Sequence, residues 1–287
     1  MEWPQILKFY ALDACTESEA MPYVWSNTVS TVDGLTNFAP IGLPAADVAD
    51  VALRSLDPLL SAADFKLLNS GWAMADAILI SGQITRHELH ASCVVSFQEM
   101  VDWRVSMNKP PQPTLLILSA SGDVSLSSHF ISTANSAGQP VCIITTQSGA
   151  ERLSRQSDDD PALTGDTNSH VKIIALEENS DGLLDLAMVL RHLHKNLAIR
   201  YLDVSCGGHV IQALRTRKLL SEIRWTISGQ ICGGVDANGR PRPQAFPAGD
   251  SSTSMTAKDS TLVRWIGQPW VFGERLVFLR GRYEYRR

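Results

Sequence analysis

Short apolar runs alternate with segments of helical periodicity along most of the chain. Four runs are almost wholly apolar, which is typical of strands covered on both faces of a parallel sheet. These four runs are residues 77–81, 114–119, 141–146 and 171–176. Further strands are predicted at 23–30 and 201–205. The pattern therefore predicts an α/β fold around a mainly parallel sheet.

Helices are predicted where apolar residues recur every three to four positions. The predicted helices cover residues 61–74, 87–101, 186–193 and 209–220. Ser61 and Asp64 have the spacing of a capping box at the start of the first helix. Asp181 is the expected cap of the third helix.

The C-terminal part of the chain has a different strand pattern. In residues 222–228 the apolar side chains at every second position are predicted to face inward, with Arg224 and Thr226 outward. Such alternation indicates an antiparallel or edge strand. Residues 262–267 and 274–287 are expected to form a hairpin. The whole pattern predicts a three-layer αβα domain with a mixed sheet and an antiparallel C-terminal hairpin.

Two polar stretches that contain Gly and Pro, residues 151–170 and 233–258, are predicted to be loops. Neither separates two complete sets of strands and helices. We therefore expect an N-terminal extension, residues 1–21, followed by one domain over residues 22–287.

Composition narrows the class of protein. The 287 residues are 44% hydrophobic and 19% charged, which argues against a disordered chain. The net charge of −5 gives no general reason to bind nucleic acid. The sequence shows neither a signal-peptide pattern nor a run of about 18 apolar residues, and its five cysteines are widely spread. We therefore expect a cytoplasmic protein without membrane or nucleic-acid partners.

The sharpest local signal is DVSCGGHVIQAL, residues 203–214, where a strand, two glycines and a helix follow one another. Gly207 and Gly208 permit a ligand to approach the backbone closely. Unpaired N–H groups at the helix start would favour a nucleotide pyrophosphate. They would belong to His209, Val210 and Ile211. The alternative interpretation is a tight strand–helix turn without a ligand.

Other candidate sites are weaker. Asp33-Gly34 follows the first strand and is either a ligand contact or a β-turn, for which this pair is favoured. His87 and His90 lie three residues apart without a third ligand nearby, so no metal site is predicted. The dinucleotide, P-loop, nucleophile-elbow and zinc-deaminase motifs are absent from the sequence.

Five segments in order resemble the pyrimidine reductases of riboflavin biosynthesis, which have a dihydrofolate-reductase-like fold. The first, residues 22–34, ends in Thr-Val-Asp-Gly, and the second contains Ala75-Asp76-Ala77, Arg86 and Glu88. The remaining segments are residues 113–124, residues 203–234 with their two Gly-Gly pairs, and the closing strand LVFLRGRYEYRR.

The resemblance implies NADPH as the hydride donor, a small-molecule substrate and a homodimer. The cofactor pyrophosphate would lie on Gly207, Gly208 and the following helix start. The family's substrate is an aminouracil that carries a ribosyl phosphate. The nicotinamide and adenosine-phosphate sides of the cofactor would be lined by Gly82, Gln83, Ile84, Thr85, Ser119 and Ser121.

Several positions depart from the family pattern. Cys206 replaces the glutamate before the first Gly-Gly pair, and Gln83-Ile84 interrupts the usual Gly-x-Gly-Thr loop. Asn27 stands where bacterial members commonly have a lysine. Losing several polar recognition groups would weaken binding of the riboflavin intermediate. We therefore expect a substrate other than that intermediate.

The sequence thus predicts an NADPH-dependent reductase of a C=N or C=O bond in a heterocyclic small molecule. Asp33 and Glu88 are the predicted polar contacts to the substrate, and Asp33 is expected to assist protonation. The other predicted substrate contacts are Trp25, Asn27, Thr31, Arg86 and Cys206. Two alternatives remain open: the authentic 5-amino-6-(5-phosphoribosylamino)uracil reductase, and a non-redox enzyme or binding protein on the same fold.

Overall fold

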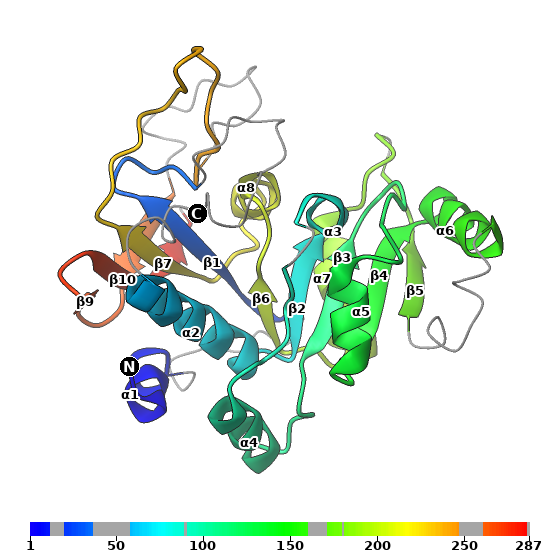
Figure 1. The fold of residues 1–287 in the computed structure, drawn as a ribbon. Helices are drawn as coiled ribbons and strands as arrows, with labels where there is room; N and C mark the ends of the chain where they lie inside the picture. Colours follow the sequence, from blue (N-terminus) through cyan, green and yellow to red (C-terminus); the bar gives the residue numbers. More distant parts are fainter. Residues whose placement is uncertain are drawn as a thin grey trace. The chain divides into compact units, whose positions relative to one another are not determined.

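The computed structural model describes residues 1–11, 20–36, 58–88, 91–159, 171–179, 181–246 and 261–285. The chain divides into two compact units (Figure 1). Unit 1 consists of Met1–Leu12, Val24–Leu68 and Ser205–Arg287, and unit 2 of Asp13–Tyr23 and Asn69–Val204. The single-domain organisation over residues 22–287 stays a prediction.

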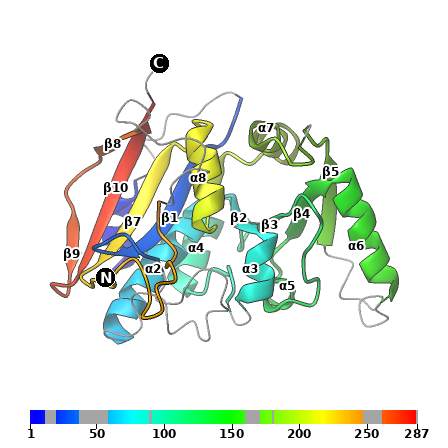
Figure 2. The same cartoon turned by 90° about the horizontal axis from the view of Figure 1, so that it is seen from above.

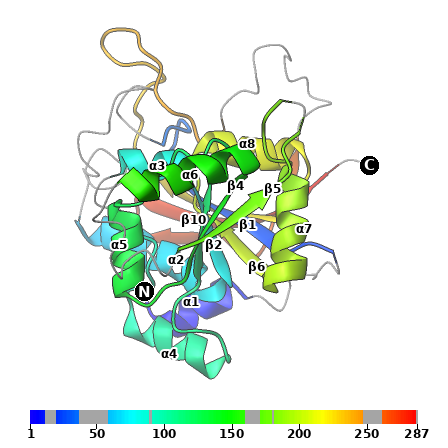
Figure 3. The same cartoon turned by 90° about the vertical axis from the view of Figure 1, so that its right-hand side faces the viewer.

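Unit 2 is built on five parallel strands in the spatial order β5-β4-β3-β2-β6 (Figure 1). Figure 3 shows the same cartoon from its right-hand side. These strands are β2 (Ala77–Ser81), β3 (Thr114–Leu118), β4 (Val141–Thr146), β5 (Val171–Leu176) and β6 (Tyr201–Val204). All six residues of β4 are buried, as are the first four of β2. The prediction of doubly covered parallel strands is confirmed for these two.

Helices of unit 2 cover both faces of these strands. They are α3 (Gly82–His87), α4 (Gln98–Ser106), α5 (His129–Ser136), α6 (Gln147–Asp159) and α7 (Leu186–Leu197). Figure 2 shows α5 and α7 on opposite sides of the strands, which confirms the three-layer prediction. The cap of α7 is Asp185, whose carboxylate accepts the Ala187 N–H at 2.8 Å. The expectation that Asp181 caps this helix is wrong.

The predicted helix over residues 87–101 is confirmed only at its end, because residues 98–101 belong to α4. Residues 91–97 are not helical, because side chains from elsewhere bind their backbone. The amide of Gln112 both accepts the Val95 N–H at 2.9 Å and donates to the Val95 carbonyl at 3.1 Å. Asn69 accepts the N–H of the next residue at 2.8 Å. These bonds replace those that a helix would have made.

The loop predicted over residues 151–170 is wrong in its first part. Residues 151–159 belong to α6, whose buried Leu153 packs inward while most of the surrounding side chains are exposed. The short apolar contact surface gave too weak a periodicity to indicate a helix. Residues 160–170 lie outside the described part of the chain.

Unit 1 contains the C-terminal strands and most of β1. In its sheet β7 pairs with β1 in parallel and with β10 in antiparallel fashion, while β8 and β9 both pair with β10 (Figure 2). The antiparallel C-terminal pairing is confirmed, although the tight hairpin is β9–β10. The strands are β1 (Tyr23–Thr31), β7 (Glu222–Ser228), β8 (Leu262–Trp265), β9 (Trp270–Phe272) and β10 (Leu276–Glu284).

Strand β7 carries a buried charge cluster instead of an exposed polar face. The Glu222 carboxylate accepts from Nε of Arg224 at 3.0 Å and from Nε of Arg280 at 2.8 Å. The Arg224 guanidinium lies 4.3 Å from the Tyr10 ring and 4.1 Å from the Trp25 ring. Because its charge is paired and stacked, Arg224 faces inward, contrary to the prediction. β7 is an interior strand of its sheet, not an edge strand.

Three helices contribute to unit 1: α1 (Trp3–Phe9), the first part of α2 (Pro58–Met74), and α8 (Gly208–Thr216). Because α2 includes Pro58, Ser61 and Asp64 lie inside the helix and do not form a capping box at its start. The Asp64 carboxyl is instead hydrogen-bonded to the hydroxyl of Thr226 on β7. Thr226 is buried and faces inward, also against the prediction.

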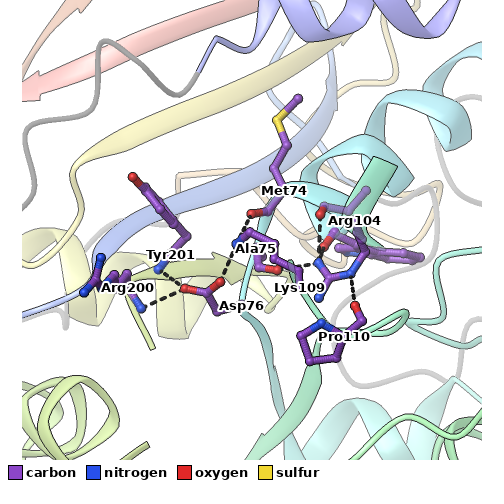
Figure 4. Close-up of polar contacts among 10 residues, drawn as sticks. Met74, Ala75, Asp76, Arg104, Lys109, Pro110, Arg200 and Tyr201 are labelled. Atoms are coloured by element: carbon purple, nitrogen blue, oxygen red, sulfur yellow. Dashed lines mark hydrogen bonds and ion pairs between the residues drawn. The ribbon is translucent and has the colours of Figure 1, made fainter. Parts of the chain in front are cut away.

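A buried arginine closes the C-terminal end of α2 in unit 2 (Figure 4). Arg104 is fully buried, and its Nη1 donates to the Ala73 and Ala75 carbonyls at 2.7 and 2.6 Å. Its Nε donates to the Pro110 carbonyl at 2.8 Å. Burial lowers the pKa of Arg104 to about 10, so the side chain stays cationic at neutral pH. The cation thus satisfies the last carbonyls of a helix, where the dipole is negative.

Asp76 joins the starts of two strands next to this arginine (Figure 4). One carboxylate oxygen accepts the N–H groups of Arg200 and Tyr201, both at 2.9 Å. The other forms an ion pair with Lys109, whose ammonium also donates to the Met74 carbonyl at 3.1 Å. The Ala-Asp-Ala segment between α2 and β2 therefore holds β6 in register beside β2.

We predict that Arg104→Ala destabilises the protein by about 3 kcal/mol, because three buried carbonyls lose their donor. Urea unfolding followed by circular dichroism measures the difference. The exposed Arg191→Ala on α7 is the control and should change stability by less than about 0.5 kcal/mol. Equal midpoints for the two variants would contradict the role assigned to Arg104.

Candidate functional site

Asp33 ties the end of β1 to the loop after β7 within unit 1. Its carboxylate accepts from the Thr31 hydroxyl at 2.5 Å, from the Gly233 N–H at 2.7 Å and from the Cys232 N–H at 3.1 Å. Partial burial raises the pKa of Asp33, but these hydrogen bonds outweigh it and lower the pKa below its usual value. Asp33 is therefore an ionised anchor of the loop, which argues against its predicted role in protonation.

The predicted substrate contacts on β1 lie in different environments. Trp25 is fully buried, and the Arg224 guanidinium lies 4.1 Å from its ring, so its contact with substrate stays a prediction. Thr31 is buried, and its hydroxyl oxygen accepts the Leu35 N–H at 3.0 Å in addition to its bond with Asp33. Asn27 alternates with these residues on the same face and is only partly buried. Of the three, Asn27 is the side chain that a ligand can reach.

In unit 2 the structure brings together two of the predicted cofactor residues. Gly82 begins α3, and a Cβ on it would lie 2.9 Å from the Ser119 Cβ and 3.0 Å from the Asp123 carbonyl oxygen. Close approach of the two backbones therefore requires glycine here. The buried Thr85 donates its hydroxyl to the Gly82 carbonyl at 2.7 Å. This hydroxyl is occupied within α3, while Gln83 is exposed and Ile84 is partly buried.

Arg86 crosslinks the turn after β3. Its guanidinium forms an ion pair with the Asp123 carboxylate at 3.2 Å, and Arg152 of α6 approaches the same carboxylate at 3.4 Å. Ser121 is exposed at this turn, and its hydroxyl oxygen accepts the Asp123 N–H at 3.4 Å. Arg86 and Ser121, both predicted site residues, thus contact the same acidic residue, Asp123. Asp123 was not among the residues predicted from the sequence.

Glu88 terminates α3, where its N–H donates to the Ile84 carbonyl at 2.9 Å. Desolvation of the carboxyl raises its pKa, although much of the residue is exposed. Because the Glu88 side chain is exposed at the end of a helix, we assign it no proton-transfer role.

The glycine pair after β6 begins α8, as the sequence predicted. Gly207 is the N-cap, and its carbonyl accepts the Val210 and Ile211 N–H groups at 3.1 and 3.4 Å. The expectation that these two N–H groups are unpaired is wrong. The predicted binding of a pyrophosphate therefore falls to the N–H groups of Gly208 and His209. A Cβ on Gly207 would meet no atom within 4 Å. Packing therefore leaves open space beside the start of the helix.

The predicted cofactor residues fall on both units. Gly82, Ser119 and their neighbours belong to unit 2. Gly207–Ile211 and the adjoining half-buried Cys206 belong to unit 1. Among the described residues, no group of three or more His, Cys, Asp or Glu is placed to hold a metal ion. Within the same residues, no helix has the length and apolar character needed to cross a bilayer.

Comparison with known proteins identifies the family. Residues 22–263 match the model of the RibD C-terminal domain. The chain belongs to the RibD C-terminal domain family. This confirms the resemblance to riboflavin-biosynthesis reductases that the five sequence segments indicated. The sequence matches none of the curated proteins with which it was compared.

Solved structures share the RibD C-terminal fold at low sequence identity. RibD of Acinetobacter baumannii, form 1, has a TM-score of 0.63 and 14% identity, with 93% of this chain and 60% of that chain covered. A pyrimidine reductase-like protein of Corynebacterium diphtheriae has a TM-score of 0.63 and 18% identity, covering 92% and 93%. The riboflavin biosynthesis reductase Rib7 of Saccharomyces cerevisiae has a TM-score of 0.60 and 16% identity, covering 99% and 100%.

These likenesses confirm the α/β, dihydrofolate-reductase-like fold. The chain spans 60% of the length of the Acinetobacter RibD chain. Two of the solved relatives are named as a pyrimidine reductase-like protein and a riboflavin biosynthesis reductase.

The structural environment of one candidate residue, Asp64, was not recognised from the sequence. Asp64 was assigned to a capping box, but in α2 it occupies the buried stripe of the helix. The signal available in the sequence was a carboxylate at the spacing of apolar neighbours. These neighbours are Leu60, Ala63 and Leu67.

We predict that Asp33→Asn lowers the stability of unit 1 by about 1 kcal/mol at pH 7, a modest value because Asp33 is exposed. Since the folded pKa is depressed, the stabilisation is complete above the unfolded value of about 3.9 and is lost as pH falls through the folded pKa. Urea midpoints at a series of pH values measure it. Asp102→Asn, at an exposed position on α4, is the control. A difference in stability between wild type and Asp33→Asn that does not vary with pH would contradict the role of Asp33 as an ionised anchor of the loop.

Proposed function

We propose that this protein is an NADPH-dependent reductase of a C=N or C=O bond in a heterocyclic small molecule. The observation that carries the proposal is the N-terminus of α8. Gly207 and Gly208 follow β6 directly, and no protein atom fills the space where a Gly207 side chain would lie. A helix start with open space beside its N–H groups suits a pyrophosphate.

The residues present fit this cofactor. The N–H groups of Gly208 and His209 would bind the cofactor phosphates. The predicted contacts of Gly82 and Ser119 in unit 2 with the cofactor stay a prediction. When bound, the dihydronicotinamide supplies a hydride, and the protein's part is to hold the substrate carbon against it. The ionised Asp33 carboxylate holds the loop that follows β7. It thereby gives the substrate side of unit 1 a defined shape.

We further propose that the substrate is not the standard riboflavin intermediate. Cys206 cannot accept hydrogen bonds as the family's glutamate does, and Asn27 brings no positive charge toward a phosphate. A site built without these partners loses affinity for a substrate that needs them. The names of the solved relatives support the authentic riboflavin reductase as an alternative, and the internal bond of Thr85 supports a non-redox protein on the same fold.

We predict that NADPH binds the wild-type protein and that Gly207→Val weakens this binding about tenfold or more without unfolding the protein. The new side chain meets open space in the free protein, so only the ligand is displaced. Nicotinamide fluorescence titration measures affinity, and thermal unfolding checks the fold. Ala137→Val, at an exposed helix end in unit 2, is the matched control.

Each alternative has its own outcome in this experiment. No binding to wild type at millimolar NADPH would contradict the reductase proposal and favour the non-redox alternative. Binding together with rescue of a riboflavin-requiring reductase-null strain would support the authentic reductase. Binding without rescue is the result that we expect.

We propose a homodimer that forms through the C-terminal strands. Leu262 and Trp265 of β8 are each 49% exposed, and β8 pairs with β10 alone among the described strands. An apolar edge of this kind suits association with a second copy. Sedimentation equilibrium should give twice the chain mass of 31.4 kDa, whereas a mass of one chain would contradict the proposal.

A further inference from the structure

Asn238 and Gly239 form the tip of a hairpin in the loop after β7. Val235 and Pro241 pair across this hairpin as an antiparallel bridge. Asn238-Gly239 is the only Asn-Gly pair in the sequence, and both residues are exposed. Gly239 has a φ of +75°, a conformation that glycine adopts without strain. The tip thus places a side-chain amide directly before a residue that has no side chain to shield its backbone nitrogen.

An Asn-Gly pair is open to deamidation, a reaction that uses water alone. The Gly239 nitrogen loses its proton to solvent hydroxide and attacks Cγ of Asn238. The N–Cγ bond forms, the Cγ–Nδ2 bond breaks, and the side-chain nitrogen takes a proton from water and leaves as ammonia. Water then opens the cyclic imide at either of its carbonyls, which gives aspartate or isoaspartate. No atom changes its oxidation state.

The closed turn restrains the attacking nitrogen. The Gly239 N–H donates to the Asp236 carbonyl at 3.0 Å, and the Asn238 N–H donates to Oδ1 of Asp236 at 2.9 Å. An N–H that donates within the turn is not free to lose its proton and approach the side chain before it. The hairpin tip must therefore open before the imide ring can form.

The Asp236 carboxylate stabilises the closed form of the tip. Oδ1 also accepts the Arg240 N–H at 2.8 Å, while Oδ2 accepts from Nε of Arg240 at 2.8 Å and forms an ion pair with Nη2 at 2.7 Å. The hydrogen bond from the Arg240 N–H lowers the pKa of Asp236 below its usual value, and the bonds from the Arg240 side chain and the Asn238 N–H add to this. The carboxylate is therefore ionised at the mildly alkaline pH that favours deamidation. Hydrogen bonds to an ionised acceptor are stronger than those to a neutral one.

The base of the hairpin is held by other bonds. Nη1 of Arg242 donates to the Cys232 and Gly233 carbonyls, both at 2.9 Å, and the Arg242 N–H donates to the Gly234 carbonyl at 3.0 Å. The Asp33 carboxylate accepts the N–H groups of Cys232 and Gly233. Because none of these bonds involves the tip, the tip can open while the base stays closed.

We propose that Asn238 is a site of spontaneous deamidation and that the Asp236 carboxylate sets its rate by holding the hairpin tip closed. The proposal goes beyond the reductase function and does not depend on it. Deamidation converts a neutral amide into a carboxylate beside the Asp236–Arg240 ion pair. The isoaspartate product also adds a carbon to the backbone of the tip. The modified loop therefore carries an additional negative charge.

The test follows conversion at Asn238 in the full chain. Wild type is incubated at mildly alkaline pH, once folded and once in urea. Mass spectrometry of peptides measures the change from amide to carboxyl, and chromatography separates the aspartate and isoaspartate products. We expect conversion in the folded chain to be slower than in urea by about tenfold or more, because the tip must open first.

One variant tests whether Asp236 provides this protection. Asp236→Ala removes both acceptor oxygens from the tip and should speed conversion in the folded protein by about threefold or more. Asp102→Ala, at an exposed position on α4, makes the same change elsewhere and should convert at the wild-type rate. Thermal unfolding checks that each variant is folded. The comparison of folded and urea-treated wild type keeps the test valid if Asp236→Ala does not fold.

Equal conversion rates for wild type in the folded state and in urea would overturn the proposal. Equal rates for folded wild type and folded Asp236→Ala would also overturn it, as would the absence of conversion at Asn238 in both. The rates are measured without cofactor or substrate, so they are independent of NADPH binding. Failure of the reductase proposal and failure of this proposal are therefore distinguishable.

Discussion

Unit 1 depends on the pairing of one buried carboxylate with two buried arginines. Glu222 accepts from Arg224 and from both Nε and Nη2 of Arg280, and all three side chains are almost completely buried. A buried ion without its partner is costly, so this pairing strongly favours one orientation of β7. That orientation places Thr226 on the inner face. The register with β1 then brings the Asp33 turn beside the loop after β7.

The same cluster makes the N-terminal segment part of unit 1. The Arg224 guanidinium lies over both the Tyr10 ring and the Trp25 ring. Desolvation by burial raises the pKa of the Tyr10 hydroxyl far above its usual value, so the ring stays neutral beside the carboxylates. Residues that were expected to be an extension thus supply one side of a cation–π sandwich in the core.

Sequence reasoning succeeded where local composition decides the structure. The continuous apolar runs at residues 77–81 and 141–146 are strands with the predicted bounds, because a strand buried on both faces has few alternatives. Residues 171–176 also form a strand with the predicted bounds, but only Ile174 in it is buried, so the expected cover on both faces is absent there. Sequence reasoning failed where a distant partner decides. Arg224 was placed outward because a lone charge avoids a core. Its pairing with Glu222 and its contacts with the Tyr10 and Trp25 rings reverse that preference.

The missed helix boundary has the same explanation. Residues 91–97 have a partly helical apolar pattern, but the side chains of Gln112 and Asn69 bind the backbone around Val95. No short segment of the sequence contains both these side chains and the backbone groups that they bind. The site shows the same division: the turn before α8 could be predicted because a strand, two glycines and a helix follow one another in the sequence, while the setting of Asp64 required knowledge of β7.

The two aspartates of unit 1 complete this argument, because the fold pushes their pKa values in opposite directions. Asp33 has three donors around an exposed carboxylate and stays ionised. Burial raises the pKa of Asp64 to about 6, and the hydrogen bond from Thr226 opposes this shift. The sequence suggested Asp33 for protonation, whereas its hydrogen bonds favour the ionised carboxylate.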